Sequence, residues 1–144
     1  MNKKPARTLL VLSALVMALV VSPAAVSYPN GIQGVKDSGC NCHGAVTSSE
    51  VVPSITGLPD QYNYSETYEI TVSFVGGPSD PSNINQGGFN LWVSDGELTP
   101  SDATVQSYSV NEVSHTEAGN DQTSWTMTWT SPSSDRNVEF LSLI

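Results

Sequence analysis

Trp125-Thr126-Met127-Thr128-Trp129-Thr130 is the most regular stretch of this sequence, because large apolar side chains alternate strictly with threonines. Successive side chains of a β-strand point to opposite faces, so the two tryptophans and Met127 share one face. Threonine is β-branched and fits the partly exposed opposite face. The stretch therefore predicts a strand whose apolar face lies in a core, with Trp125 and Trp129 as core residues rather than a ligand platform.

The same alternation recurs on the N-terminal side of this stretch. One segment alternates at Tyr68, Ile70, Val72 and Phe74. Another alternates at Phe89, Leu91 and Val93, although Trp92 interrupts its polar side. Weaker strand candidates span 51–55, 104–110 and 138–143. We expect Trp92 to be buried in the core, although its side of the strand also fits a sheet edge or a binding surface.

Clusters of turn-forming residues separate these strands. They lie at 57–60, 76–88, 94–96, 117–121 and 131–135. Such clusters, rich in Gly, Pro, Asn, Asp and Ser, end strands and reverse the chain. No segment after residue 27 shows a sustained helical period. Several short strands with turns between them predict an all-β fold, an antiparallel immunoglobulin-like β-sandwich over residues 51–144.

The first 27 residues have the features of a secretory signal peptide. Three basic residues within the first seven positions precede an apolar stretch over 9–21. Small residues at 25–27 fit the site that a signal peptidase reads, so we expect cleavage between Ser27 and Tyr28. A membrane anchor is the alternative, but this stretch of 13 residues is shorter than the ~20 that a spanning helix needs. Both interpretations place the protein outside the cytoplasm, secreted or at the cell surface.

Removal of the signal leaves a strongly acidic chain of about 117 residues, enough for one domain with one core. Lys36 and Arg136 then face fourteen acidic residues, which gives a formal net charge of −12. Such a surface repels nucleic acid and anionic lipid. We therefore expect no nucleic-acid partner, and membrane association only through an uncleaved signal or an anchor that this sequence does not contain.

The run Gly39-Cys40-Asn41-Cys42-His43-Gly44 holds both cysteines and one of the two histidines. It lies in a Cys- and Gly-rich N-terminal loop, residues 28–50. In an exported protein the simplest interpretation is a disulfide between Cys40 and Cys42, which the flanking glycines would help to bend. Free thiols with no role are a further alternative, although export disfavours them.

Two cofactor interpretations compete with the disulfide. Covalent attachment of haem c normally uses Cys-x-x-Cys-His, and here the spacer is one residue short. Cys40 and Cys42 would then carry the haem, His43 would be the proximal ligand and His115 the distal one. Alternatively, Cys40, Cys42 and His43 would bind Cu(I) or Zn(II), with His115 as a fourth ligand. In each case we expect this region to fix residues 28–44, whose backbone the sheet alone would hold poorly.

Several short motifs follow one another in a recognisable order. They are Tyr28-Pro29-Asn30-Gly31, Gly39-Cys40-Asn41-Cys42-His43, Gly57-Leu58-Pro59, Gly87-Gly88-Phe89-Asn90-Leu91, Asp102-Ala103-Thr104-Val105-Gln106 and the segment 125–132. The series resembles the secreted prokaryotic domains of the choice-of-anchor V family, which are similar to the Reeler (reelin N-terminal) domain. The resemblance implies an extracellular β-sandwich carried on surface proteins, often followed by a C-terminal anchor. Because the sequence stops at 141–144 within a predicted strand, we expect a C-terminally truncated chain whose sandwich is incomplete.

The expected function is adhesion or binding of an extracellular protein or glycan. The sequence contains no Gly-x-Ser-x-Gly elbow, and neither histidine has Ser and Asp neighbours in a recognisable triad order. We therefore expect a non-enzymatic module. The alternative is a haem-binding electron-transfer protein that uses the Cys-Asn-Cys-His run.

Intact-mass measurement of the exported protein tests the signal peptide. We expect a chain that begins at or near Tyr28, because the apolar stretch is too short to remain as a membrane span. A mature protein that retained residues 1–27 would contradict this expectation and support the anchor instead.

Overall fold

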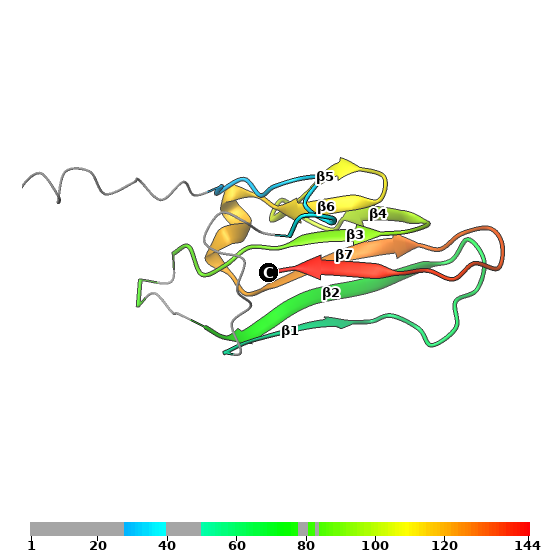
Figure 1. Ribbon diagram of the computed structural model, residues 1–144, viewed down its shortest axis with the longest axis horizontal. Coiled ribbons are helices and arrows are strands. Elements are labelled where there is room, and N and C mark those ends of the chain that lie inside the picture. Colours follow the sequence, from blue (N-terminus) through cyan, green and yellow to red (C-terminus); the bar gives the residue numbers. More distant parts are fainter. Residues whose placement is uncertain (1–27, 40–49, 78–80, 83) are drawn as a thin grey trace, which may run out of the picture.

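Antiparallel pairing joins the strands of this chain into two four-stranded sheets (Figure 1). The computed structural model describes residues 28–39, 50–77, 81–82 and 84–144. In the first sheet the strand order is β1 (Val51–Thr56), β2 (Thr67–Gly76), β7 (Ser124–Thr130) and β4 (Glu97–Pro100). In the second sheet the order is β5 (Val105–Ser109), β6 (Glu112–His115), β3 (Asn90–Val93) and β8 (Phe140–Leu143).

One apolar cluster lies between the two sheets. β2 and β7 pair in a register that sets Ile70 opposite Met127 and Val72 opposite Trp125, so these side chains share the inner face. The buried cluster consists of Ile70, Val72, Phe74, Phe89, Leu91, Val93, Leu98, Val105, Val113, Trp125, Met127 and Trp129. Burial of apolar surface is the main favourable term in folding. The predicted antiparallel β-sandwich is therefore confirmed, as are the core positions of Trp125 and Trp129.

Two short strands, β4 and β6, are absent from the sequence-based expectation. β4 has a single buried apolar side chain, Leu98, and ends at Pro100, so four residues carry almost no alternation. β6 is also four residues long. A tight turn connects it to β5, which lies within the predicted strand 104–110. Each lies beside a strand with a clear pattern, β4 beside β7 and β6 beside β3. Pairing with β7 and β3, rather than the β-propensity of their own residues, therefore accounts for β4 and β6.

The expectation that Trp92 is buried in the core is wrong. Its neighbours Leu91 and Val93 point into the core, so the indole points to the outer face of the second sheet and is partly exposed. Lys36 Nζ lies 4.4 Å from the centroid of its ring. That distance allows a cation–π interaction, which here joins the N-terminal region to β3.

Helical structure in the described residues is limited to one 3₁₀ helix, η1 (Glu117–Asp121), in a segment predicted as a turn. Thr116 precedes it, and its hydroxyl accepts a hydrogen bond from Gly119 N at 3.2 Å, as an N-cap does. Nowhere in the described ranges is a helix both long and apolar enough to cross a membrane.

The indole N–H groups of both core tryptophans donate to backbone carbonyls. Trp125 Nε1 donates to Gly119 O at 2.7 Å, and Trp129 Nε1 donates to Asp95 O at 3.1 Å. Buried polar groups left unpaired are costly, so these bonds allow large side chains to be buried completely. Gly96 has φ +91°, and a Cβ at this position would overlap Trp129 Nε1. The turn between β3 and β4 therefore requires glycine at this point.

Residues 28–38, called here the N-terminal strap, cross the outer face of the second sheet beside β5 and β6 (Figure 1). Asn30 O accepts a hydrogen bond from Tyr108 OH at 2.8 Å. Ile32 O accepts one from Asn90 Nδ2 at 2.8 Å. Asn90 is almost fully buried beneath the strap, although it lies on the outward-facing side of β3. Side chains of the sheet, rather than a backbone ladder, thus hold this segment.

Glu112 is the charged anchor of the strap. One carboxylate oxygen, Oε1, accepts hydrogen bonds from Gly34 N at 2.7 Å and from Asn90 Nδ2 at 2.9 Å. Val35 is buried next to these contacts, with 7% of its surface exposed. Burial, and then the charge of Glu112, raises the pKa of Tyr108 above its usual value.

Hydrogen bonds from Tyr108, Asn90 and Glu112 to the strap are contacts that the sequence analysis did not foresee. The proposed role of Cys40 and Cys42 in fixing this region lies outside the described residues and stays a prediction.

Hydrogen exchange distinguishes the contribution of Glu112 to holding the strap from that of Cys40 and Cys42. In Glu112→Ala the amide of Gly34 should exchange ~10–100-fold faster, because a hydrogen bond to a charged group contributes about 1.5–3 kcal/mol. Glu69→Ala is the matched control, since Glu69 is an exposed glutamate on β2 of the other sheet. The Cys40→Ser/Cys42→Ser double variant, measured alongside, reports the contribution of the cysteines. Unchanged exchange in Glu112→Ala would show that the carboxylate does not hold the strap.

Candidate functional site

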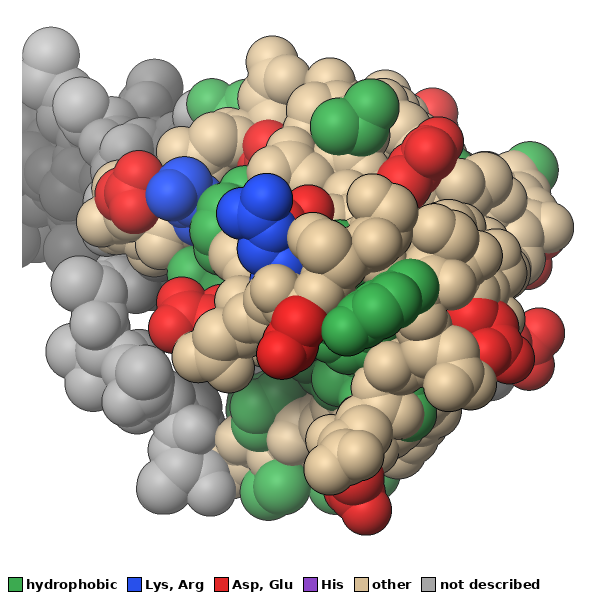
Figure 2. Space-filling model, turned by 90° about the vertical axis from the view of Figure 1, so that its right-hand side faces the viewer, with side chains coloured by type: hydrophobic (Ala, Val, Ile, Leu, Met, Phe, Trp, Pro, Cys, Tyr) green, Lys and Arg blue, Asp and Glu red, His purple; other side chains and the backbone are tan. Residues whose placement is uncertain are grey.

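A groove of about 670 Å³ opens at one end of the sandwich. Its walls are residues 58–64, from the loop between β1 and β2, and residues 135–138, from the loop between β7 and β8. Trp129 and Phe140 lie at its inner end. The two loops leave the sheets at the same end (Figure 1). Figure 2 looks onto this end and shows hydrophobic side chains as separate patches among polar ones, with acidic side chains around them.

Backbone and side-chain hydrogen bonds join the bases of the two loops. Ser131 N donates to Glu66 O at 2.9 Å, and Ser65 N donates to Pro132 O at 3.0 Å. The hydroxyl of Ser131 donates to Asn63 O at 2.6 Å and accepts from Glu66 N at 3.0 Å. These contacts span more than sixty positions of sequence. They hold the groove walls at a set separation even where the loops carry no strand pairing.

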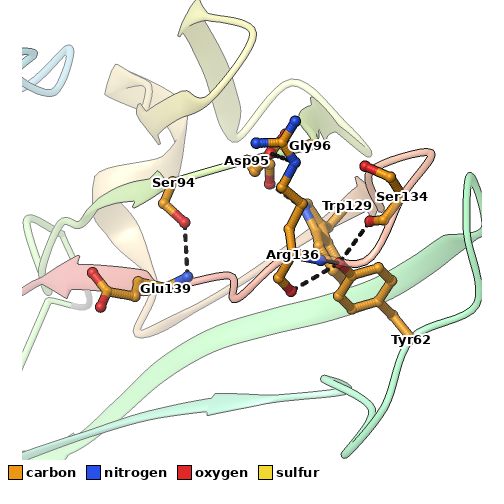
Figure 3. A network of polar contacts seen from close by, with 8 residues as sticks. All are labelled: Tyr62, Ser94, Asp95, Gly96, Trp129, Ser134, Arg136 and Glu139. Atoms are coloured by element: carbon orange, nitrogen blue, oxygen red, sulfur yellow. Dashed lines mark hydrogen bonds and ion pairs between the residues drawn. The ribbon is translucent and has the colours of Figure 1, made fainter.

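Tyr62 ties the loops together a second time, further from the sheets (Figure 3). Its hydroxyl donates to Arg136 O at 2.9 Å and has Ser134 O as a further acceptor at 3.1 Å. The same oxygen accepts a hydrogen bond from Arg136 N at 2.8 Å. A phenol can donate one proton and accept others, so this hydroxyl is fully used by the backbone of the opposite loop.

The turn between β3 and β4 supports the second loop from behind. Arg136 Nε lies 3.5 Å from Asp95 Oδ2, and both side chains remain substantially exposed. Ser94 and Glu139 are joined twice, through Ser94 N to Glu139 O at 2.9 Å and Glu139 N to Ser94 Oγ at 2.8 Å. Figure 3 shows Arg136 between Tyr62 on one side and this turn on the other.

Aromatic rings run from the core to the surface through this site. Trp129 meets the edge of Phe140 at a centroid distance of 5.1 Å and the edge of Tyr62 at 5.5 Å. Tyr62 in turn contacts Tyr64 at 6.3 Å. Trp129 is 2% exposed, whereas Tyr64 is 59% exposed. The outermost ring therefore presents a large apolar face that the fold does not cover.

The polar side chains of the groove supply both donors and acceptors. Asp60, Gln61, Asp135 and Asn137 are exposed at its walls, and Arg136 exposes most of its guanidinium. Carboxylates accept, guanidinium groups donate and amides do both. With an exposed aromatic face beside them, these groups suit the binding of a partly polar ligand.

Three of the four sequence-predicted ligands, Cys40, Cys42 and His43, lie outside the described residues. The fourth, His115, is described. It is the last residue of β6, and its exposed fraction is 9%. Its ring centroid is 6.5 Å from those of both Phe89 and Trp125. The structure therefore does not test whether these four residues come together.

His115 already uses one ring nitrogen within the core. Phe89 N donates a hydrogen bond to Nδ1 at 3.0 Å, which leaves Nε2 as the nitrogen for any further partner. Gly88 packs against the ring so closely that a Cβ there would overlap it. A role of His115 as a ligand of haem iron, copper or zinc stays a prediction, and it would have to use Nε2.

Other acidic residues of the described chain form no metal site. No group of three His, Cys, Asp or Glu side chains comes together within the described ranges. Asp102, for example, accepts hydrogen bonds from Thr104 N at 2.7 Å and from Thr104 Oγ1 at 2.5 Å. These bonds lower the pKa of Asp102 by stabilising its charged form, the hydroxyl more than the amide. The carboxylate thus stabilises its own turn.

Comparisons with known proteins give structural similarity only. No model of a protein family matches the chain, and no curated protein matches it. Among solved structures it is similar to human F-spondin reeler domain fragment 1, with 21% identity, 65% of this chain and 74% of that chain covered, and a TM-score of 0.46. It is also similar to the Reelin-N domain of F-spondin, with 21% identity, 65% of this chain and 70% of that chain covered, and a TM-score of 0.47. A similarity at this level assigns no function.

The sequence does not single out the groove. Its walls, residues 58–64 and 135–138, overlap the predicted turns 57–60 and 131–135 only in part and are more than seventy positions apart. One signal was present, because Gln61-Tyr62-Asn63-Tyr64 places two aromatic residues next to a turn and outside any alternating strand. Aromatic residues in such a position are candidates for a surface contact.

A visible absorption spectrum tests the haem alternative. Protein made in a cell with haem-maturation machinery should show covalently bound haem if Cys40 and Cys42 carry it, and the Cys40→Ser/Cys42→Ser variant should lose the signal. A colourless parent protein from such a cell would contradict haem attachment and leave the disulfide and the soft-metal site.

Proposed function

We propose that this chain is an extracellular, non-enzymatic β-sandwich that binds a partner at the cell surface through the groove at residues 58–64 and 135–138. The observation that carries the proposal is the pair of loops, joined by Tyr62, around an exposed aromatic ring and exposed polar side chains. Loops held by a rigid scaffold are where binding residues concentrate. The groove combines an apolar surface with converging polar groups, as ligand sites do.

The extracellular location rests on the sequence of residues 1–27, a basic start followed by an apolar stretch and small residues. The acidic character of the remaining chain agrees with a soluble module exposed to the medium. Attachment to a larger surface protein follows from the resemblance to choice-of-anchor V domains, and is part of the proposal.

A binding role rather than catalysis fits how the groove residues are used. The Tyr62 hydroxyl is engaged with the opposite loop, and the Nε of Arg136 faces Asp95. These two groups hold the shape of the groove, while the exposed carboxylates of Asp60 and Asp135 are left as hydrogen-bond acceptors for a ligand. Turnover of a small substrate by the purified domain would contradict a binding-only role.

The loop connection gives a direct test. Fluorescently labelled domain should bind the surface of cells from its source, and Tyr62→Phe should weaken this binding by up to ~30-fold. The substitution removes one hydroxyl with two hydrogen bonds, each contributing about 1 kcal/mol, and the loops then lose their outer connection. Binding is measured by flow cytometry over a range of domain concentrations.

Tyr108→Phe is the matched control. It also removes a tyrosine hydroxyl that donates to a loop carbonyl, but at the N-terminal strap instead of the groove. Equal binding by parent, Tyr62→Phe and Tyr108→Phe would contradict the groove as the binding site. Equal weakening in both variants would point to general loosening of the domain.

A further inference from the structure

We infer that the groove binds an uncharged glycan, with Tyr64 as the platform for a sugar ring. This inference rests on the proposed function and names the class of ligand. The ligand class follows from four features of the groove: its exposed ring, its planar polar groups, its charge and the state of its backbone groups.

Tyr64 is the outermost ring of the aromatic series and is 59% exposed. Its neighbour Tyr62 lies at a centroid distance of 6.3 Å and an interplanar angle of 60°, and this contact leaves more than half of the Tyr64 surface exposed. A sugar ring presents C–H groups on its face and hydroxyls around its edge. An aromatic face that is apolar and slightly negative suits those C–H groups.

Planar polar side chains line the same groove as Tyr64. Gln61 and Asn137 offer amides, while Asp60 and Asp135 offer carboxylates, all exposed at the groove walls. Each sugar hydroxyl both donates and accepts, so a mixed set of amides and carboxylates can satisfy several hydroxyls at once. A purely apolar ligand would leave these groups unpaired.

The charge of the groove disfavours an anionic ligand. Asp60 and Asp135 line the walls, and the single basic side chain among the lining residues, Arg136, faces Asp95 at 3.5 Å. The chain as a whole has a formal net charge of −9. Like charges repel an acidic polysaccharide or an anionic lipid surface. A neutral sugar polymer meets no such barrier.

Several backbone groups at and beside the groove are already bonded within the fold. The amides of Asn63, Ser65 and Glu66 donate to Tyr68 OH, Pro132 O and Ser131 Oγ, respectively. On the other wall, both N and O of Arg136 are bonded to Tyr62 OH. A peptide that added as a strand would need such backbone groups free. The engagement of these groups favours recognition through side chains, which suits a hydroxyl-rich ligand.

Affinity electrophoresis tests the inference on the exported protein. Native gels that contain dextran, galactomannan or xyloglucan present uncharged polysaccharides, and a gel with polygalacturonate presents an anionic one. At least one neutral polymer should retard the parent protein, and free oligosaccharide from that polymer should relieve the retardation. Polygalacturonate should not retard it.

Variants of Tyr64 assign the binding to the groove. Tyr64→Ala should weaken retention about tenfold by removing the platform, whereas Tyr64→Phe keeps the ring and should bind like the parent. Tyr28→Ala is the matched control, because Tyr28 is also an exposed tyrosine, at 52%, but lies in the N-terminal strap. Tyr64 is on the surface, so its loss should leave thermal unfolding unchanged.

Each contrary result has a distinct meaning. Retention that survives Tyr64→Ala overturns the role of the groove, and retention by polygalacturonate alone overturns the uncharged ligand. If no neutral polymer binds while poly-L-proline does so in a Tyr64-dependent way, the glycan is overturned and the proposed function stands. If no neutral polymer binds but cell-surface binding is still reduced by Tyr62→Phe, the ligand class fails and the binding groove remains.

Discussion

The packing of Trp129 is the interaction on which both the core and the groove depend. Its ring stacks on Tyr68 at a centroid distance of 5.8 Å and meets the edges of Tyr62 and Phe140. Its N–H donates to Asp95 O in the turn between β3 and β4. Aromatic pairs of this kind contribute about 0.5–1.5 kcal/mol each beyond the area that they bury. One side chain thus joins both sheets and two connecting segments.

This arrangement explains why a surface site can be rigid on a small β-domain. The loops that form the groove walls are held at their base by β2 and β7, and at their outer part by Tyr62 packed on Trp129. Preorganised loops lose less conformational entropy when a ligand binds. The groove therefore draws its shape from the core instead of from the ligand.

Sequence reasoning reached the sandwich because two long segments alternate strictly, at 68–74 and 125–130. It missed β4 and β6 because four residues with one or two apolar side chains carry too little pattern. It placed Trp92 in the core. The alternation of β3, in which Leu91 and Val93 point inward, instead turns Trp92 to the outer face beside Lys36. At Trp92 the alternation of side chains along the strand was the better guide.

The groove could not be predicted from the sequence, for a different reason. Its two walls meet only after β2 and β7 have paired, and turn composition carries no information on which loops will be neighbours. The Cys-Asn-Cys-His run attracted attention because Cys and His are chemically distinctive. His115, which was predicted to join it as a ligand, packs beside Phe89 and Trp125. Distinctive residue types and the place where a ligand fits need not coincide.

The connections between the groove loops have a consequence for behaviour at different ionic strengths. Exposed ion pairs weaken as dissolved salt screens them, with a screening length of about 8 Å at 0.15 M and about 3 Å at 1 M. The contacts that join the walls, through Tyr62, Ser65 and Ser131, are hydrogen bonds between uncharged groups, and only the exposed Arg136–Asp95 pair is ionic. The groove should therefore keep one shape from fresh water to concentrated brine, while the mutual repulsion of the acidic surface fades.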